Sequence, residues 1–252
     1  MIGILAYSYS DVATIMENAT ILNQKKIGNV TYYLVNINGN QVYVILVGAG
    51  KVNVASGLMY ALVKLCIKKV IVVGNAASLN EEEYPIGSVA IATGSLEWDV
   101  NYINLGYPAN VVPGNTVSIY PTDSTLFKEA VDASNGLGYQ TFSGLFASGD
   151  TFVASTAQAD QIETATGADF LDVETGVVGQ IAFEYNIPIG KADLTCENSF
   201  GDLYMQTMKM SEKGHMIVVR LSEQNGRRGK IKLGGKVKIL NFPVEKALSA
   251  VA

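Results

Sequence analysis

The 252-residue sequence predicts a single α/β domain. Short apolar runs alternate with segments of helical periodicity along most of the chain, as in a sheet whose strands are connected by helices. The run from Lys69 to Gly74 is almost continuously apolar, which is typical of a strand covered by helices on both faces of the sheet. A hydrophobic content of 48% supplies a sizeable core for one domain of this length.

The individual elements follow from local patterns. The Asn38-Gly39 pair is a strong turn signal, so the apolar runs on either side are predicted to form a β-hairpin. Apolar positions spaced three or four residues apart predict the helices. We expect strands at residues 2–6, 30–36, 41–47, 69–74, 87–92, 141–148 and 170–173 and from 186–188 onward, and helices beginning at 10 and spanning 52–66, 124–135, 157–164, 174–185 and 203–213.

Charge is unevenly distributed along the chain. Residues 1–189 contain seven lysines, 17 acids and no arginine, whereas residues 190–252 carry a net charge of +5. Because arginine is the usual bidentate ligand of phosphate, its absence before Arg220 argues against a phosphate-rich ligand and against nucleic acid as a partner. No apolar run is long enough for a membrane span and no secretory signal is recognisable, so we expect a soluble, cytoplasmic protein.

The sequence predicts neither a metal site nor a cofactor. Cys66 and Cys196 are too few and too far apart for a disulfide framework or a zinc site, and His215 is the one histidine. Buried thiols and a helix cap at His215 are the simpler interpretations. The turn Gly48-Ala49-Gly50-Lys51 precedes a predicted helix and either binds an anion at the helix N-terminus or is simply a tight turn.

Two stretches contain the candidate binding residues. Residues 148–155 offer an aromatic side chain, Phe152, among small residues, and residues 170–176 place Asp172 and Glu174 on an apolar run. Burying an unpaired carboxylate costs several kcal/mol, so these acids either bind a polyhydroxylated ligand or cap the helix that follows. Asp11, which follows the first strand, is likewise either a helix cap or a site acid.

Five segments of the chain share their order and spacing with one protein family. They are Ile2-Gly3-Ile4 with Asp11-Val12, Gly48 to Val52, Val73 to Ala77, Trp98-Asp99 with Gly106-Tyr107 and Pro113-Gly114, and Ser148 to Phe152 with Asp172 to Glu174. The chain resembles the nucleoside phosphorylase and hydrolase superfamily, and within it the methylthioadenosine/S-adenosylhomocysteine nucleosidases. This resemblance implies a three-layer αβα sandwich around a mixed, partly closed sheet, and a homodimer.

The resemblance also implies roles for individual residues. Phe152 would stack on adenine, the backbone of Val153 would bond the purine edge, and Glu174 would bind the ribose hydroxyls. Asp11 stands where the nucleosidases have a glutamate that positions the attacking water. The other implied substrate-binding residues are Val173 under the sugar, Asp172, Phe200, Ala76, Ala77, Asn75 at a position usually occupied by serine, and Tyr107 and Pro113 in a loop that reaches the partner subunit's pocket.

The general acid is where the chain departs from this family. The family places an aspartate at the end of the strand that follows Asn-x-Pro. Ungapped spacing from Pro188 puts Glu197 in that position and Asp193 where an arginine is expected. A rival alignment with a long insertion makes Glu223 the acid. Asp193 itself is a third candidate, and absence of a functional acid is the fourth possibility.

The resemblance therefore implies hydrolysis of the N-glycosidic bond of a 5′-modified adenine nucleoside, with Glu197, Asp11 and Glu174 as catalytic residues. Water replaces phosphate as the nucleophile when no arginine lines the anion site. The alternatives are a purine nucleoside phosphorylase and a catalytically degenerate member that binds or stores nucleosides. Residues 1–225 are expected to form this domain, and residues 226–252 a basic extension that is either solvated or binds an acidic partner.

Overall fold

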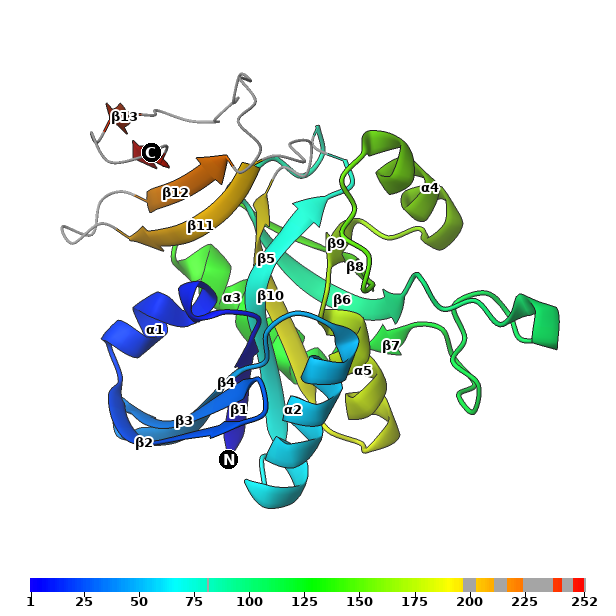
Figure 1. Cartoon of the computed structure of the whole chain (residues 1–252), viewed down its shortest axis with the longest axis horizontal. Helices are drawn as coiled ribbons and strands as arrows, with labels where there is room; N and C mark the ends of the chain where they lie inside the picture. The colour runs from blue at the N-terminus through cyan, green and yellow to red at the C-terminus, as the bar shows by residue number, and fades with distance from the viewer. Residues whose placement is uncertain (81, 197–202, 211–216, 224–237, 242–246, 252) are drawn as a thin grey trace.

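The computed structural model describes residues 1–80, 82–196, 203–210, 217–223, 238–241 and 247–251. A ten-stranded sheet forms the centre of the molecule (Figure 1). Its strands are β1 (Ile2–Ala6), β2 (Thr20–Ile27), β3 (Val30–Ile37), β4 (Asn40–Leu46), β5 (Lys69–Ser78), β6 (Val89–Glu97), β7 (Tyr120–Pro121), β8 (Thr141–Ser148), β9 (Phe170–Asp172) and β10 (Ile189–Cys196).

The central sheet is mixed and partly closed, as predicted. The strand order is β10-β6-β8-β9-β5-β1-β4-β3-β2, and β7 pairs with β6. Strand β10 also pairs with β5, so that β5, β10, β6, β8 and β9 form a closed ring. Within this ring β10 runs parallel to β5 and antiparallel to β6. The ring brings the ends of β5, β8, β9 and β10 together, which is where the candidate site lies.

Helices cover both faces of the sheet. They are α1 (Ala13–Glu17), α2 (Lys51–Lys64), α3 (Ser124–Gly136), α4 (Thr156–Thr166) and α5 (Thr175–Glu184), with 3-10 turns η1 (Tyr9–Val12) and η2 (Ile103–Leu105). Leu5 of β1 belongs to the core cluster formed with α2 and α5, whereas its neighbour Ala6 packs with Val12 and Met16 on the opposite face. Successive strand residues therefore face different helical layers, which confirms the three-layer arrangement.

The local signals in the sequence located most of these elements. At the predicted hairpin, Asn38 and Gly39 have φ values of 50° and 86°, the left-handed conformation that a two-residue turn requires at both positions. Strand β2 was not predicted, because its side chains are exposed almost throughout and show no alternation of apolar and polar residues. It adds to the edge of the sheet by antiparallel pairing with β3.

The helix predicted at residues 203–213 is wrong. Residues Leu203–Met210 instead form a strand, β11, which pairs antiparallel with β12 (Ile217–Glu223). Strands β14 (Ala247–Val251) and β13 (Lys238–Asn241) complete a second sheet in the order β11-β12-β14-β13. The Leu, Met and Lys content of residues 203–210 favours a helix only weakly, and pairing with the β-branched run in β12 outweighs it.

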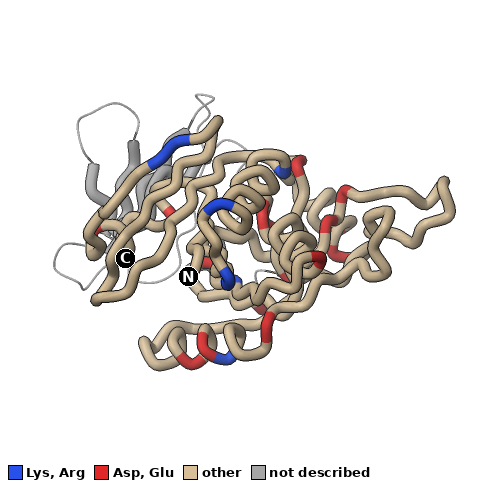
Figure 2. Tube along the Cα trace, turned by 90° about the horizontal axis from the view of Figure 1, so that it is seen from below, with Lys and Arg blue, Asp and Glu red and all other residues tan. Residues whose placement is uncertain are grey.

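The second sheet combines strands from both sides of residue 225. This arrangement of strands does not show whether residues 226–252 have a separate role, so that role stays a prediction. Acidic side chains outnumber basic ones over much of the described chain (Figure 2). Among the described residues, no helix combines the length and apolarity needed to cross a bilayer.

Candidate active site

The two stretches singled out in the sequence lie side by side at the ends of β8 and β9. Ser148, the last residue of β8, pairs in register with Asp172, the last residue of β9. Beyond β8 the chain turns at Gly149, where a side chain would collide with the indole of Trp98 at 2.6 Å. The side chain of Phe152 is then 66% exposed, whereas Val153 is buried. An aromatic ring thus stands in solvent beside a rigid, buried strand end.

Asp172 caps helix α5. Its carboxylate accepts hydrogen bonds from the backbone amide of Thr175 at 3.3 Å and from the Thr175 hydroxyl. The Ser148 hydroxyl also donates to Asp172, and in turn accepts from the amide of Gly176 at 2.7 Å. These bonds satisfy free amides in the first turn of the helix. Of the two acids for which the sequence left capping open, Asp172 therefore does the capping.

Glu174 makes no capping bond, although it occupies the N-cap position of α5. Its side chain is buried, and Oε1 accepts a hydrogen bond from Nζ of Lys191 at 3.0 Å. Gly74 of β5 permits this placement, because a Cβ there would lie 2.9 Å from Oε1 of Glu174. The Glu174 carboxylate is therefore held by a cation on a neighbouring strand and is free of helix capping.

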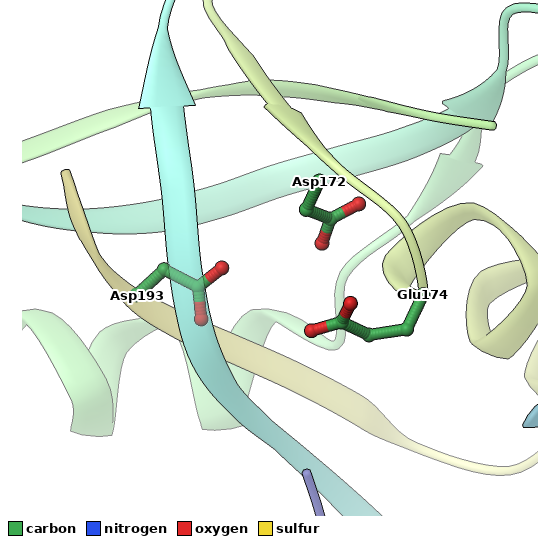
Figure 3. Close-up of side chains that lie close together, drawn as sticks. All are labelled: Asp172, Glu174 and Asp193. Atoms are coloured by element: carbon green, nitrogen blue, oxygen red, sulfur yellow. The ribbon is translucent and has the colours of Figure 1, made fainter. Parts of the chain in front are cut away.

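Lys191 lies at the centre of three carboxylates. Its Nζ is 3.0 Å from Glu174, 3.1 Å from Asp172 and 2.7 Å from Asp193. The three carboxyl groups come from β9, from the start of α5 and from β10, and they point toward one shared centre (Figure 3). Oxygens of the three lie within 4.8 Å of one another, a spacing suited to a cation, and the Lys191 ammonium supplies that cation.

Burial dominates the electrostatics of this cluster, which comprises Lys191, Asp172, Glu174 and Asp193 and is called the Lys191 cluster below. Burial raises the pKa of Glu174 to about 8 and that of Asp193 to about 7, against the opposing effect of the Lys191 ammonium. Burial alone would lower the pKa of Lys191, but the three carboxylates together raise it above its ordinary value. The lysine is therefore charged, while Glu174 and Asp193 hold their protons to a higher pH than ordinary carboxyl groups do.

Asp193 differs from its neighbours in having few polar contacts. Its side chain is buried and Oδ2 pairs with Nζ of Lys191 at 2.7 Å, whereas among the described residues Oδ1 has no hydrogen-bond partner. Oxygen Oδ1 lies near Gly74, where a Cβ would be 3.5 Å away. A buried carboxyl group with unused acceptor capacity is costly to ionise, which fits its raised pKa.

Asp11 both caps and faces the site. Its Oδ2 accepts the backbone amide of Ser8 at 2.8 Å, and its Oδ1 accepts Nδ2 of Asn75 at 3.1 Å. Burial raises the pKa of Asp11, and the Ser8 hydrogen bonds and the charge of Lys191 oppose that shift. One oxygen of Asp11 therefore caps η1 and the other reaches Asn75 of β5, while its role as a site acid stays a prediction.

The remaining predicted site residues are distributed more widely. Ala76 and Ala77 are buried at the end of β5, and Val173 is half-buried between Asp172 and Glu174. Tyr107 and Pro113 are exposed on the connection of residues 98–119, which projects from the body of the molecule (Figure 1). Glu197 and Phe200 lie outside the described residues, and Glu223 ends β12, where the backbone alone is described.

Lys191 is the residue that the sequence analysis missed. It lies in the segment that follows Pro188, where Glu197, Asp193 and Phe200 were considered as site residues but Lys191 was not. A usable signal was present: residues 191 and 193 point to the same face of a strand, and both are charged in a segment expected to be buried. An opposite-charge pair at that spacing in a central strand predicts a buried ion pair.

A protein-family model matches most of the chain. The model of the phosphorylase superfamily matches residues 1–213. The chain belongs to this superfamily. The match covers the central sheet and all residues of the Lys191 cluster.

Individual relatives are distant. The chain is 26% identical over 214 residues to a 5′-methylthioadenosine/S-adenosylhomocysteine nucleosidase of Staphylococcus haemolyticus, covering 80% of this chain and 93% of the relative. It is 24% identical over 217 residues to an aminodeoxyfutalosine nucleosidase of Campylobacter jejuni, covering 83% and 94%. The nucleosidase of Neisseria meningitidis in complex with methylthio-immucillin-A superposes with a TM-score of 0.74 at 22% identity, covering 78% of this chain and 85% of that one. The last similarity establishes the fold.

Proposed function

We propose that this protein hydrolyses the N-glycosidic bond of a 5′-modified adenine nucleoside and releases adenine. The observation that carries the proposal is the pairing of an exposed aromatic ring, Phe152, with a buried carboxylate, Glu174, beyond the ends of adjacent strands β8 and β9. A planar base stacks on an aromatic face, and ribose hydroxyls donate to a carboxylate. The names of the two relatives support a nucleosidase reaction.

The residues divide the chemistry among them. Breaking the bond to the base places positive charge on the ribose, and the Glu174 carboxylate stabilises that charge. Asp11 positions the attacking water through the oxygen that accepts from Asn75. Glu197 protonates the departing base; it follows Cys196, which pairs with Ala77 at the end of β10. Phe152 and the backbone of Val153 hold the adenine.

Two further proposals concern assembly and compartment. We expect a cytoplasmic homodimer in which the connection of residues 98–119 contacts the partner. Tyr102, Leu105 and Tyr107 of this connection are exposed, with Leu105 at 72%. Light scattering after gel filtration should give twice the mass of the chain, and the variant Leu105→Asp should shift the protein toward a monomer.

The decisive experiment measures free base. Purified protein is incubated with methylthioadenosine, S-adenosylhomocysteine, aminodeoxyfutalosine and inosine, with and without phosphate. We expect adenine release from one of the 5′-modified adenine nucleosides without phosphate. Hydrolysis by water needs no phosphate. Strict dependence of base release on phosphate would therefore establish the phosphorylase alternative. Binding of adenine nucleosides without release would establish the degenerate, nucleoside-binding alternative.

Substitutions locate the two halves of the proposed site. Phe152→Ala should weaken nucleoside binding by about 1–3 kcal/mol, the usual contribution of a base stacked on an aromatic ring, and leave the unfolding midpoint unchanged because the ring is exposed. Tyr185→Ala is the matched control, since Tyr185 is 54% exposed at the opposite end of α5 from Glu174. Equal binding losses in both variants would contradict the assignment of Phe152.

The general acid requires its own test. Glu197→Gln should abolish adenine release while nucleoside binding persists, because an amide cannot donate the proton that a carboxylic acid supplies. Glu223→Gln should leave turnover intact. The reverse result would transfer the acid role to Glu223, and full activity in both variants would direct attention to Asp193.

A further inference from the structure

The charges of the Lys191 cluster do not balance. One ammonium faces three carboxyl groups in a space from which water is excluded, since the side chain of Lys191 has no exposed surface. Among the described residues, the charged groups that face Glu174 are Lys191 and Asp193 from β10 and Asp172 from β9. Asp11 of η1 acts on Asp193. Lys191 is the one cation among them.

The members of the cluster act on Glu174 in opposite directions. Lys191 favours the charged form of Glu174 through its charge and its 3.0 Å hydrogen bond. Asp172 and Asp193 favour the neutral form through repulsion. Asp172 already serves the N-terminus of α5, so its charge has a second stabilising partner. Burial has the largest effect on the charge of Glu174, followed by Lys191, Asp172 and Asp193, and of these groups Lys191 and Asp193 lie on the same strand, β10.

We propose that Lys191 is a positioning residue of the active site, whose ammonium holds the Glu174 carboxyl group in place and favours its ionised form, with Asp193 as the opposing group on the same strand. The use of Glu174 in catalysis rests on the proposed function. The control of its charge does not, because it follows from the three ion-pair distances around Lys191. Lys191 acts through Glu174 and is itself buried beneath it.

The test compares two substitutions that have opposite electrostatic effects. Glutamate side chains are labelled with ¹³C at the carboxyl carbon, and the titration of Glu174 is followed by NMR in the ligand-free protein, with Glu174→Gln as the assignment control. We expect Lys191→Met to raise the Glu174 midpoint by about one pH unit or more, since an opposite charge at this distance contributes that much. Asp193→Asn should lower it. Lys191→Arg should retain a midpoint near that of the unmodified protein.

A purely structural role for Lys191 gives a different result. If the lysine only fills space, Lys191→Met leaves the Glu174 midpoint where it is, and that outcome overturns the proposal. A shift of the same sign in Lys191→Met and Asp193→Asn overturns it as well. Lys128→Met, which removes an exposed lysine on α3, controls for the change in net charge and should not move the midpoint.

A second comparison covers the case in which Lys191→Met does not fold. The double variant Lys191→Met/Asp193→Asn removes the ammonium together with the carboxyl group nearest to it. It differs from Asp193→Asn at position 191 alone, so a Glu174 midpoint no higher than that of Asp193→Asn overturns the proposal.

Turnover separates this proposal from the proposed function. If adenine is released, the pH at which kcat/KM rises should follow the Glu174 midpoint. At low pH, Lys191→Met should then lose about tenfold in kcat/KM for each pH unit by which the midpoint rises, and it should recover at high pH. If the midpoints move as expected but no variant releases adenine, the nucleosidase proposal fails and the role of Lys191 stands. If adenine is released and the midpoints do not move, the nucleosidase proposal stands and the proposed role of Lys191 fails.

Discussion

Two lysines of this protein each bind several carboxylates, and the two sites differ in their access to water. Lys191 is fully buried among three acids. Lys51, the first residue of α2, pairs with Glu97 at 2.5 Å and with Asp99, and its side chain remains 20% exposed. Water can compensate excess negative charge at Lys51 but cannot do so at Lys191. The buried cluster therefore has to bind protons or a ligand, whereas the cluster at Lys51 can remain a structural contact.

The contacts around Lys51 join segments that lie far apart in the sequence, at residues 51, 99 and 150. The backbone amide of Lys51 donates to Asp150 at 2.8 Å, and the amide of Asp150 donates to Asp99 at 3.0 Å. The glycine turn before α2 thus has an anion at its helix N-terminus, and that anion is the protein's own Asp150. Because Phe152 follows two residues later, this contact holds the turn that carries the aromatic ring.

Removing the buried ammonium should have the largest effect on stability. Lys191→Met leaves three acids without their cation, and breaking a buried ion pair in this way costs about 3–5 kcal/mol. Urea unfolding at pH 8 measures the loss, which should shrink at pH 5 because the carboxyl groups then become protonated. Lys191→Arg is the control that keeps the charge. An equal loss at both pH values would mean that packing, and not charge, is responsible.

The pH dependence of stability should show the same imbalance without any substitution. Asp193 has an ordinary pKa of 3.8 and a folded-state pKa of about 7, so the folded protein binds more protons than the unfolded chain between these values. Stability is therefore greatest at low pH and falls as pH rises toward 7, and Glu174 extends the fall to about pH 8. Between pH 5 and 8 in urea unfolding, we expect a decrease of about 3 kcal/mol from Asp193 and a similar decrease from Glu174.

Asp193→Asn should flatten this pH profile, since the group that accounts for much of the slope is gone. Asp160→Asn on α4 is the matched control, because Asp160 is exposed and should leave the slope unchanged. A profile as steep in Asp193→Asn as in the unmodified protein would place the proton-binding groups elsewhere.

Lys51→Met should have an intermediate effect. It leaves Glu97, whose side chain is 6% exposed, without its cation, and a lost hydrogen bond to a charged group costs about 1.5–3 kcal/mol. Partial access of water lowers the cost relative to Lys191. The unfolding midpoint in urea measures the loss, and Lys51→Arg should restore most of it. A loss as large as that of Lys191→Met would contradict the distinction between the two sites.

The two clusters also show what the sequence could predict. Asp172 and Glu174 were predictable as site residues because acids in an apolar strand require an explanation. The structure distinguishes them, since Asp172 caps α5 and Glu174 does not. The pairing of Lys191 with them depends on β10 lying beside β5 in the closed ring, and this long-range pairing leaves no periodic signal in the sequence. The same holds for Lys51 and Asp99, which approach each other only through the fold.

The fold shows the same division between local and long-range information. Strand β1 and the hairpin of β3 and β4 follow from apolar runs and from the turn at Asn38-Gly39. The exposed edge strand β2 has no alternation to reveal it. At β11 the pairing with β12 outweighs the local preference for a helix, and the residues of β11 themselves give no signal of this pairing.

Removal of an exposed lysine should have the smallest effect on stability. Lys128 pairs with Asp132 one turn further along α3 at 2.6 Å, but the two side chains are 76% and 63% exposed. Exposed pairs gain little because water solvates both charges when the pair is broken, so Lys128→Met should leave the urea midpoint unchanged within error. The distance in this pair is as short as that between Lys191 and Asp193. If Lys128→Met nevertheless destabilised the protein as much as Lys51→Met, contact distance and not burial would determine the energetic role of these lysines, and the electrostatic account of the Lys191 cluster would lose its basis.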